Sequence, residues 1–133
     1  MKLLLDTHIL LWLIYSPDKL PSHWLSALKN PDNQLYVSHL SYWEIALKYS
    51  LGKLTLKGAT PEDIPTLAQR MGITSLGSSA QVLASIHQSP LIEGHKDPFD
   101  RALIWTAIYE QLTLVSHDQK MNDYHTLGLS LLK

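Results

Sequence analysis

Asp97-Pro98-Phe99-Asp100-Arg101-Ala102-Leu103-Ile104 is the stretch from which the organisation of this chain can be worked out. Pro98 suits the first turn of a helix, because a backbone N–H at that position has no intrahelical partner to lose. Asp97, directly before it, is typical of an N-cap that accepts unpaired backbone N–H groups. Capping does not require the second carboxylate, Asp100, although the helix dipole tolerates it in the first turn. We therefore ask which other acidic side chains the fold brings close to Asp100.

The composition indicates one globular domain that spans residues 1–133. Hydrophobic residues make up 45% of the chain and charged residues 17%, which excludes a disordered protein. The absence of cysteine excludes disulfides and thiolate metal sites. The first residues do not resemble a signal peptide, and the apolar run at 9–15 is far shorter than the ~20 residues of a membrane span. We expect a cytoplasmic protein without membrane contact. The net charge of −1 offers no general attraction for nucleic acid, so a phosphate-rich partner would require a local basic patch or a bound cation.

Short apolar segments alternate with helical segments along the chain. The segment 2–5 has the length of a parallel strand that is buried on both faces, and similar segments predict strands at 34–38, 73–76, 113–116 and 127–132. Helices are predicted to begin near Ile9, Pro21, Ser41, Thr60, Ser78 or Ser79, Pro98 and Lys120. Ser41 with Glu44 three places on has the pattern of a capping box. The alternation predicts a three-layer α/β/α fold with a mostly parallel central sheet.

Four acids from separate parts of the chain are predicted to meet at one edge of this sheet. Asp6 and Asp118 each follow a strand, and the carboxyl ends of parallel strands share an edge. Glu44 and Asp100 lie in the first turns of helices that begin at the same edge. Four carboxylates packed together would repel one another, and a hard divalent cation removes that penalty. Oxygen ligands select Mg²⁺ or Mn²⁺, and such a cation polarises a phosphate and lowers the pKa of a bound water.

Each acid also has a purely structural interpretation. Asp97 is better explained as a cap than as a ligand, and Glu44 fits the capping box. Asp6 could cap the helix that follows it, and Asp118 could belong to a turn or a cap. A metal site is favoured because Asp6, Glu44, Asp100 and Asp118 all fall at one predicted edge.

Other polar and aromatic residues give weaker indications. The hydroxyl of Thr7 could hold a water or the Asp6 carboxylate, and His95 and His117 are candidates for substrate contacts beside the acids. Trp24 is a candidate for an interface. Helical spacing predicts a core position for the aromatic residues Trp12, Trp43, Trp105 and Phe99. The basic residues that could face phosphate are Lys48, Lys53, Lys57, Lys96 and Arg101.

Four motifs stand in order along essentially the whole chain. They are Met1-Lys2-Leu3-Leu4-Leu5-Asp6-Thr7-His8, Ser41-Tyr42-Trp43-Glu44-Ile45-Ala46, His95-Lys96-Asp97-Pro98-Phe99-Asp100-Arg101 and Leu114-Val115-Ser116-His117-Asp118. Together they resemble the motifs of the PIN domain, and within it those of small bacterial toxins of the VapC type. The strand followed by Asp-Thr is a weak signal alone, whereas the Trp-Glu-Ile and Asp-Pro-Phe-Asp-Arg segments together are specific.

The resemblance implies a Mg²⁺- or Mn²⁺-dependent endoribonuclease that cuts single-stranded or structured RNA such as tRNA. It also implies a homodimer that is held inactive by a small antitoxin, which inserts a peptide near the acidic cleft. By motif match, Asp6, Glu44, Asp100 and Asp118 would ligate the metal and activate water. Ser116-His117 precedes the last acid where the family more often has a pair such as Thr-Arg, so the resemblance does not define substrate contacts at this end of the cleft.

Two other functions stay open from the residues alone. A catalytically inactive, partner-binding PIN-like module would keep the fold without turnover. A phosphoacceptor signalling domain of receiver type also gathers acids around Mg²⁺ at the edge of a parallel sheet. Such a domain would have paired acids after the first strand, and Asp6 has no acidic neighbour.

Overall fold

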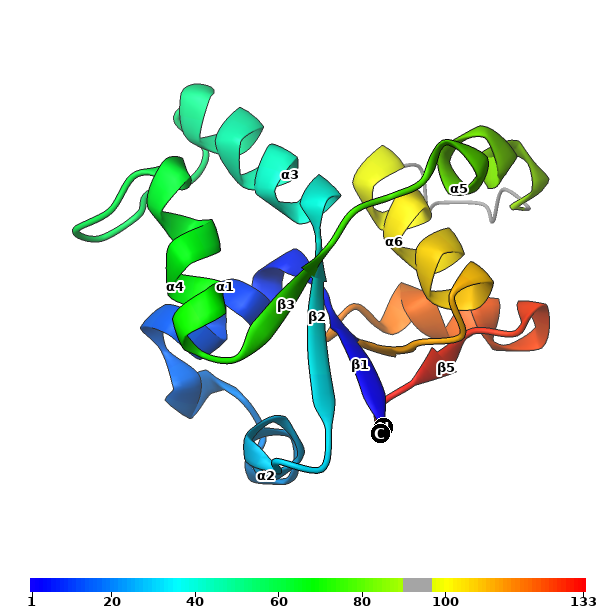
Figure 1. Ribbon diagram of the computed structural model, residues 1–133, viewed down its shortest axis with the longest axis horizontal. Coiled ribbons are helices and arrows are strands. Elements are labelled where there is room, and N and C mark those ends of the chain that lie inside the picture. The colour runs from blue at the N-terminus through cyan, green and yellow to red at the C-terminus, as the bar shows by residue number, and fades with distance from the viewer. Residues whose placement is uncertain (90–96) are drawn as a thin grey trace.

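The computed structural model describes residues 1–89 and 97–133, and its centre is a five-stranded sheet with the order β3-β2-β1-β4-β5 (Figure 1). Every pair of neighbouring strands is parallel. The strands are β1 (Lys2–Leu5), β2 (Gln34–Ser38), β3 (Ile73–Leu76), β4 (Thr113–Val115) and β5 (Ser130–Leu131). β1 lies in the middle, and its three leucines are completely buried, which confirms the predicted strand with two covered faces.

Helices cover both faces of the sheet, as the three-layer prediction requires. Leu3 and Leu5 of β1 pack in a cluster with side chains of α1, α2, α3 and α4, whereas Leu4 packs on the opposite face against α6 and η4. Figure 1 shows α1 and α4 on one side of the sheet and α6 on the other. The helices are α1 (Thr7–Tyr15), α2 (Ser22–Lys29), α3 (His39–Ser50), α4 (Ile64–Arg70), α5 (Ala80–Ser85) and α6 (Pro98–Tyr109). Short 3₁₀ segments are η1 (Pro17–Lys19), η2 (Pro61–Asp63), η3 (Ile86–Gln88) and η4 (Gln119–Leu127).

Side-chain caps fix where the helices begin. Asp97 caps α6, because its Oδ1 accepts the backbone N–H groups of Phe99 at 2.8 Å and Asp100 at 3.2 Å. Asp6 and Asp118 likewise cap α1 and η4. The structural interpretation of these acids is therefore confirmed, and it does not exclude a second role for the carboxylate oxygens that capping leaves unused.

The predicted capping box at Ser41 and Glu44 is wrong. β2 passes directly into α3 without a loop, and Ser38, the last residue of the strand, caps the helix by accepting the N–H of Leu40 at 3.1 Å. Ser41 and Glu44 therefore lie inside α3, and both side chains are buried. Elsewhere the boundaries shift by a few residues: α1 begins at Thr7, α6 ends at Tyr109, and β5 covers only two of the six residues predicted for it.

In the part of the chain that the structure describes, no helix combines the length and apolar character needed to cross a membrane.

Candidate functional site

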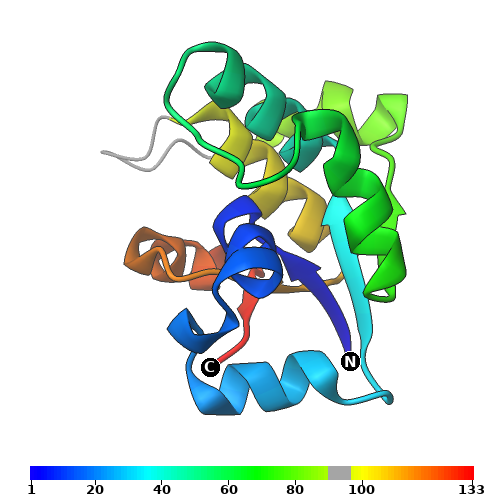
Figure 2. The same ribbon diagram turned by 90° about the vertical axis from the view of Figure 1, so that its left-hand side faces the viewer.

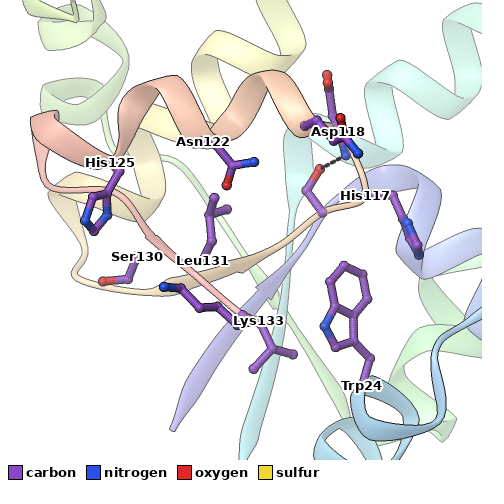
Figure 3. A pocket seen from close by; sticks show the side chains of 11 residues that line it. Trp24, His117, Asp118, Asn122, His125, Ser130, Leu131 and Lys133 are labelled. Carbon is purple, nitrogen blue, oxygen red and sulfur yellow. Dashed lines mark hydrogen bonds between the residues drawn. The ribbon is translucent and has the colours of Figure 1, made fainter.

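The carboxyl ends of β1 and β4 carry a connected set of polar groups. The backbone N–H of Asp6 donates to the carbonyl of Val115 at 3.0 Å, which continues the β1–β4 ladder past Leu5. The Ser116 hydroxyl donates to Oδ2 of Asp6 at 2.7 Å, and it accepts the backbone N–H of Asp118 at 3.1 Å (dashed in Figure 3). Ser116 thus links the two acids that follow the strands.

The buried carboxylate of Glu44 lies on the other side of Asp6. Its side chain is only 8% exposed, although it belongs to a helix that covers the sheet edge. The Thr7 hydroxyl, which is also buried, donates to Oε1 of Glu44 at 2.7 Å and lies 2.9 Å from Oγ of Ser41. Thr7 therefore holds Glu44, and the predicted contact from its hydroxyl to Asp6 is wrong.

Lys48 provides a positive charge at the second oxygen of Glu44. Its Nζ donates to Oε2 at 2.5 Å across one turn of α3. This hydrogen bond raises the pKa of Lys48, and the negative charges of Glu44, Asp97 and Asp100 act in the same direction against partial desolvation of the ammonium group. The two α6 acids are thus close enough to Lys48 to influence it.

Burial is the main reason why the pKa of Asp6 is raised above its ordinary value. The hydrogen bonds from Ser116 and from the backbone of His8 oppose this rise, while the charge of Glu44 adds to it. Asp6 and Glu44 are therefore close enough for their charges to repel each other. Such a pair gains most from a cation.

The four predicted acids fall into two connected sets. Lys48 contacts Glu44, and the charge of Asp100 helps to raise the pKa of this lysine; Ser116 donates to the Asp6 carboxylate and accepts the backbone N–H of Asp118. α3 and α6 contact each other, as both ribbon views show (Figures 1 and 2). Among the described residues, however, no three Asp, Glu or His side chains are arranged to hold a single ion. The four acids thus share an edge without forming a finished cage.

The donor set fits Mg²⁺ or Mn²⁺ for two reasons. Mg²⁺ keeps several waters and takes only one or two protein carboxylates, so it does not need a complete protein cage. In addition, the Lys48 ammonium group contacts Glu44, so this carboxylate has a positively charged partner in the metal-free protein. Asp6 and Glu44 would be the first ligands of such a cation, because the charge of Glu44 adds to the raised pKa of Asp6 and a cation would relieve that repulsion.

Aromatic rings line the Asp118 end of the edge. The ring centre of His117 lies 4.9 Å from that of Trp12 and 4.7 Å from that of Trp24. A hollow of about 690 Å³ opens beside Asp118 and Trp24 (Figure 3). Trp24 is only 8% exposed, so its predicted interface role is wrong. The substrate contact predicted for His117 stays a prediction.

Two further predictions concern residues of α3 and the segment before α6. Trp43 is 60% exposed and packs edge-on against Phe99 with ring centres 5.1 Å apart, so its predicted core position is wrong. His95 and Lys96, predicted to contact substrate and phosphate, lie outside the described residues.

Sequence reasoning did not identify the Ser116 hydroxyl as a partner of Asp6. The signal was available in the strand register, because Leu5 pairs with Val115 and the next residues, Asp6 and Ser116, are therefore neighbours.

Comparisons with known proteins decide the family. A family model described as the PIN domain matches residues 3–126. The chain belongs to the PIN domain family. The arrangement above is thus that of a PIN domain, with acids at the carboxyl edge of its parallel sheet. A search of curated proteins found no match.

Solved structures share the fold of this PIN domain across its whole length. The structure of VapBC-1 from nontypeable Haemophilus influenzae matches with a TM-score of 0.67 and 20% identity, covering 100% of this chain and 98% of that one. DNA-bound VapBC from Salmonella typhimurium matches with a TM-score of 0.66 and 16% identity over 99% and 97% of the two chains. VapBC2 from Rickettsia felis, bound to a DNA fragment from its promoter, gives 0.62 and 20% over 99% and 98%.

Proposed function

We propose that this PIN domain is a Mg²⁺- or Mn²⁺-dependent endoribonuclease and the toxin of a type II toxin–antitoxin pair. Asp6, Glu44, Asp100 and Asp118 hold the metal and orient the attacking water. The observation that carries the proposal is the proximity of two acids at the carboxyl edge of the sheet: the buried Glu44, held by Thr7 and Lys48, and the half-buried Asp6, held by Ser116. Burying two acids side by side destabilises a protein, and function is the reason to retain them.

The chain's own residues would position the reaction. When bound, the cation polarises the scissile phosphate and stabilises the charge that develops on the leaving oxygen. Thr7 orients Glu44, and Ser116 orients Asp6. These hydrogen bonds would keep both carboxylates in position while negative charge develops on the leaving oxygen of the RNA. The acids at the edge accept hydrogen bonds from a water and place it in line with the phosphodiester bond.

The cation also serves binding in this proposal. Carboxylates repel the phosphate backbone of RNA, and the whole chain carries a net charge of −1. Lys48 and the bound cation would therefore supply the positive potential that the acidic edge lacks. The proposed substrate is RNA, single-stranded or structured as in tRNA.

The partners follow from the relatives. The three solved structures with the same fold are VapBC structures, and two of them include bound DNA. By analogy, we propose that the present chain binds a small cognate antitoxin. We also propose that the present chain forms a homodimer.

The receiver-type alternative does not agree with the topology. Doubly wound signalling domains of that type have the strand order 2-1-3-4-5, whereas this sheet has the order β3-β2-β1-β4-β5. The remaining alternative is a PIN module that binds a partner without cleaving RNA.

Cleavage of an end-labelled RNA by the purified protein tests the proposal. We expect cleavage with Mg²⁺ or Mn²⁺ and none with EDTA. Asp6→Asn and Asp100→Asn should each lower the rate by at least about a hundredfold, because each removes a ligand charge. Asp18→Asn, at an exposed acid of η1, is the matched control and should cleave like the parent.

Two results would contradict the proposal. Cleavage that survives both Asp6→Asn and Asp100→Asn would place the activity at another site or in a contaminant. A parent protein that binds an antitoxin but leaves RNA intact at every metal concentration would establish the inactive, partner-binding module.

A further inference from the structure

The ammonium group of Lys48 stands where a divalent cation would need to bind. Nζ lies 2.5 Å from Oε2 of Glu44, and the opposite oxygen, Oε1, is occupied by the Thr7 hydroxyl. In this state Lys48 therefore neutralises a carboxylate whose side chain is only 8% exposed. Without Lys48, Glu44 would be a buried charge with no cationic partner at either oxygen.

The charges that face Lys48 come from two helices. Glu44 lies one turn earlier on α3, and Asp97 and Asp100 lie at the start of α6. All three act on the ammonium group as negative charges and raise the pKa of Lys48. A divalent cation would be attracted to the same place.

A metal ion and the ammonium group cannot both bind Oε2 of Glu44 at contact distance without strong mutual repulsion. Lys48 has room to leave, because its side chain is 40% exposed and its long stem can turn toward solvent. Glu44 has no such freedom, since Thr7 and the surrounding core fix it.

We propose that Lys48 is an intramolecular competitor of the metal: it neutralises Glu44 in the metal-free protein, and the divalent cation must displace it. Lys48 thereby weakens the affinity of the site for metal and sets the concentration at which the site fills. This inference rests on the proposed function, because it needs a divalent cation at Glu44.

Metal titration of lysine variants tests the inference. Isothermal titration of the metal-depleted protein with Mn²⁺ would compare the parent with Lys48→Gln, Lys48→Met and Lys48→Arg. Lys53→Gln, at an exposed lysine five residues on, is the matched control. No RNA is needed, so the measurement does not depend on catalysis.

We expect removal of the charge to tighten metal binding. One unit charge roughly 5 Å from a divalent ion changes its affinity about seventeenfold in a water-like dielectric, and salt reduces this to about fivefold. Lys48→Gln and Lys48→Met should therefore lower the Kd for Mn²⁺ about fivefold, whereas Lys48→Arg and Lys53→Gln should stay within about twofold of the parent.

Thermal unfolding with and without metal provides a second readout that also detects a loss of stability in the metal-free variants. Lys48→Gln should melt at a lower temperature than the parent in EDTA, because Glu44 has lost its counter-ion. It should gain more from saturating Mn²⁺ than the parent gains, because ligand stabilisation grows with affinity. A lysine with a merely structural role would lower both melting temperatures equally.

The outcomes separate this inference from the proposed function. If the parent binds Mn²⁺ but Lys48→Gln and Lys48→Met bind it equally well or more weakly, the competition is disproved and the metal site stands. If the parent binds no Mn²⁺ at millimolar concentration, both the competition and the proposed metal dependence are disproved.

Discussion

Removal of the Thr7 hydroxyl measures how much the hydrogen bond to Glu44 contributes to the free energy of unfolding. Thr7 is 5% exposed, and its hydroxyl donates to Oε1 of Glu44 at 2.7 Å. Thr7→Val keeps the shape of the side chain and removes the hydroxyl, which donates to Glu44 and lies 2.9 Å from Oγ of Ser41. The variant therefore leaves one oxygen of a buried carboxylate without its hydrogen bond, while Lys48 still contacts the other.

The expected loss of stability follows from the charge of the acceptor. A hydrogen bond to a charged group contributes about 1.5–3 kcal/mol, so we expect Thr7→Val to lower the free energy of unfolding by about 2 kcal/mol. For a domain of this size that corresponds to a decrease in Tm of roughly 6 °C.

The assay is urea unfolding in EDTA, followed by the fluorescence of the four tryptophans. Thr106→Val is a matched control, because Thr106 is 2% exposed and its hydroxyl donates at 2.7 Å to the neutral carbonyl of Ala102. That carbonyl keeps its helical partner, so the control should lose only about 0.5 kcal/mol. Equal losses in the two variants would refute the reasoning, because the charge on Glu44 would then contribute nothing.

Three further changes test other parts of the site and fold. Asp6→Asn should stabilise the metal-free protein by on the order of 1 kcal/mol at pH 7. Burial raises the pKa of Asp6 above its ordinary value of 3.8. The folded protein therefore loses stability as the pH rises from 3.8 through the raised pKa, and asparagine avoids this loss. Urea unfolding in EDTA at pH 7 measures this gain, and a less stable variant contradicts it. Ser116→Ala should weaken Mn²⁺ binding about tenfold, since Ser116 orients the Asp6 carboxylate; calorimetry checks this, and unchanged affinity argues against the role. Gly128→Ala should cost about 1 kcal/mol, because Gly128 ends η4 with φ +98°; an unchanged Tm would show that the turn relaxes.

The strands were predictable because short apolar segments of the sequence have the length and composition of strands that are buried on both faces. Lys2–Leu5 is apolar and short, and a strand covered on both faces has that pattern. Once strands alternate with helices, the parallel sheet and the position of Asp6 at its carboxyl edge follow. The cap at Asp97 was equally predictable, since Asp before Pro has a local physical cause.

The face of α3 was not predictable from periodicity. Its buried residues are Ser41, Glu44 and Ile45, and two of these three are polar, while Trp43 on another face is exposed. A helical pattern assigns the apolar side chains to the core, and it fails where a carboxylate such as Glu44 takes an inward position. Long-range partners such as Thr7 and Glu44, 37 residues apart, become visible only when the chain is folded.

In the proposed function, acids from distant parts of the chain share one cation. A crystal soaked in Mn²⁺, with anomalous diffraction recorded at the manganese absorption edge, tests it most directly. We predict an anomalous peak at the carboxyl edge of the sheet, about 2.2 Å from oxygens of Asp6 and at least one of Glu44 and Asp100, with the Lys48 ammonium group moved away from Oε2. A soak that fills other sites but leaves this edge without a peak would contradict the account.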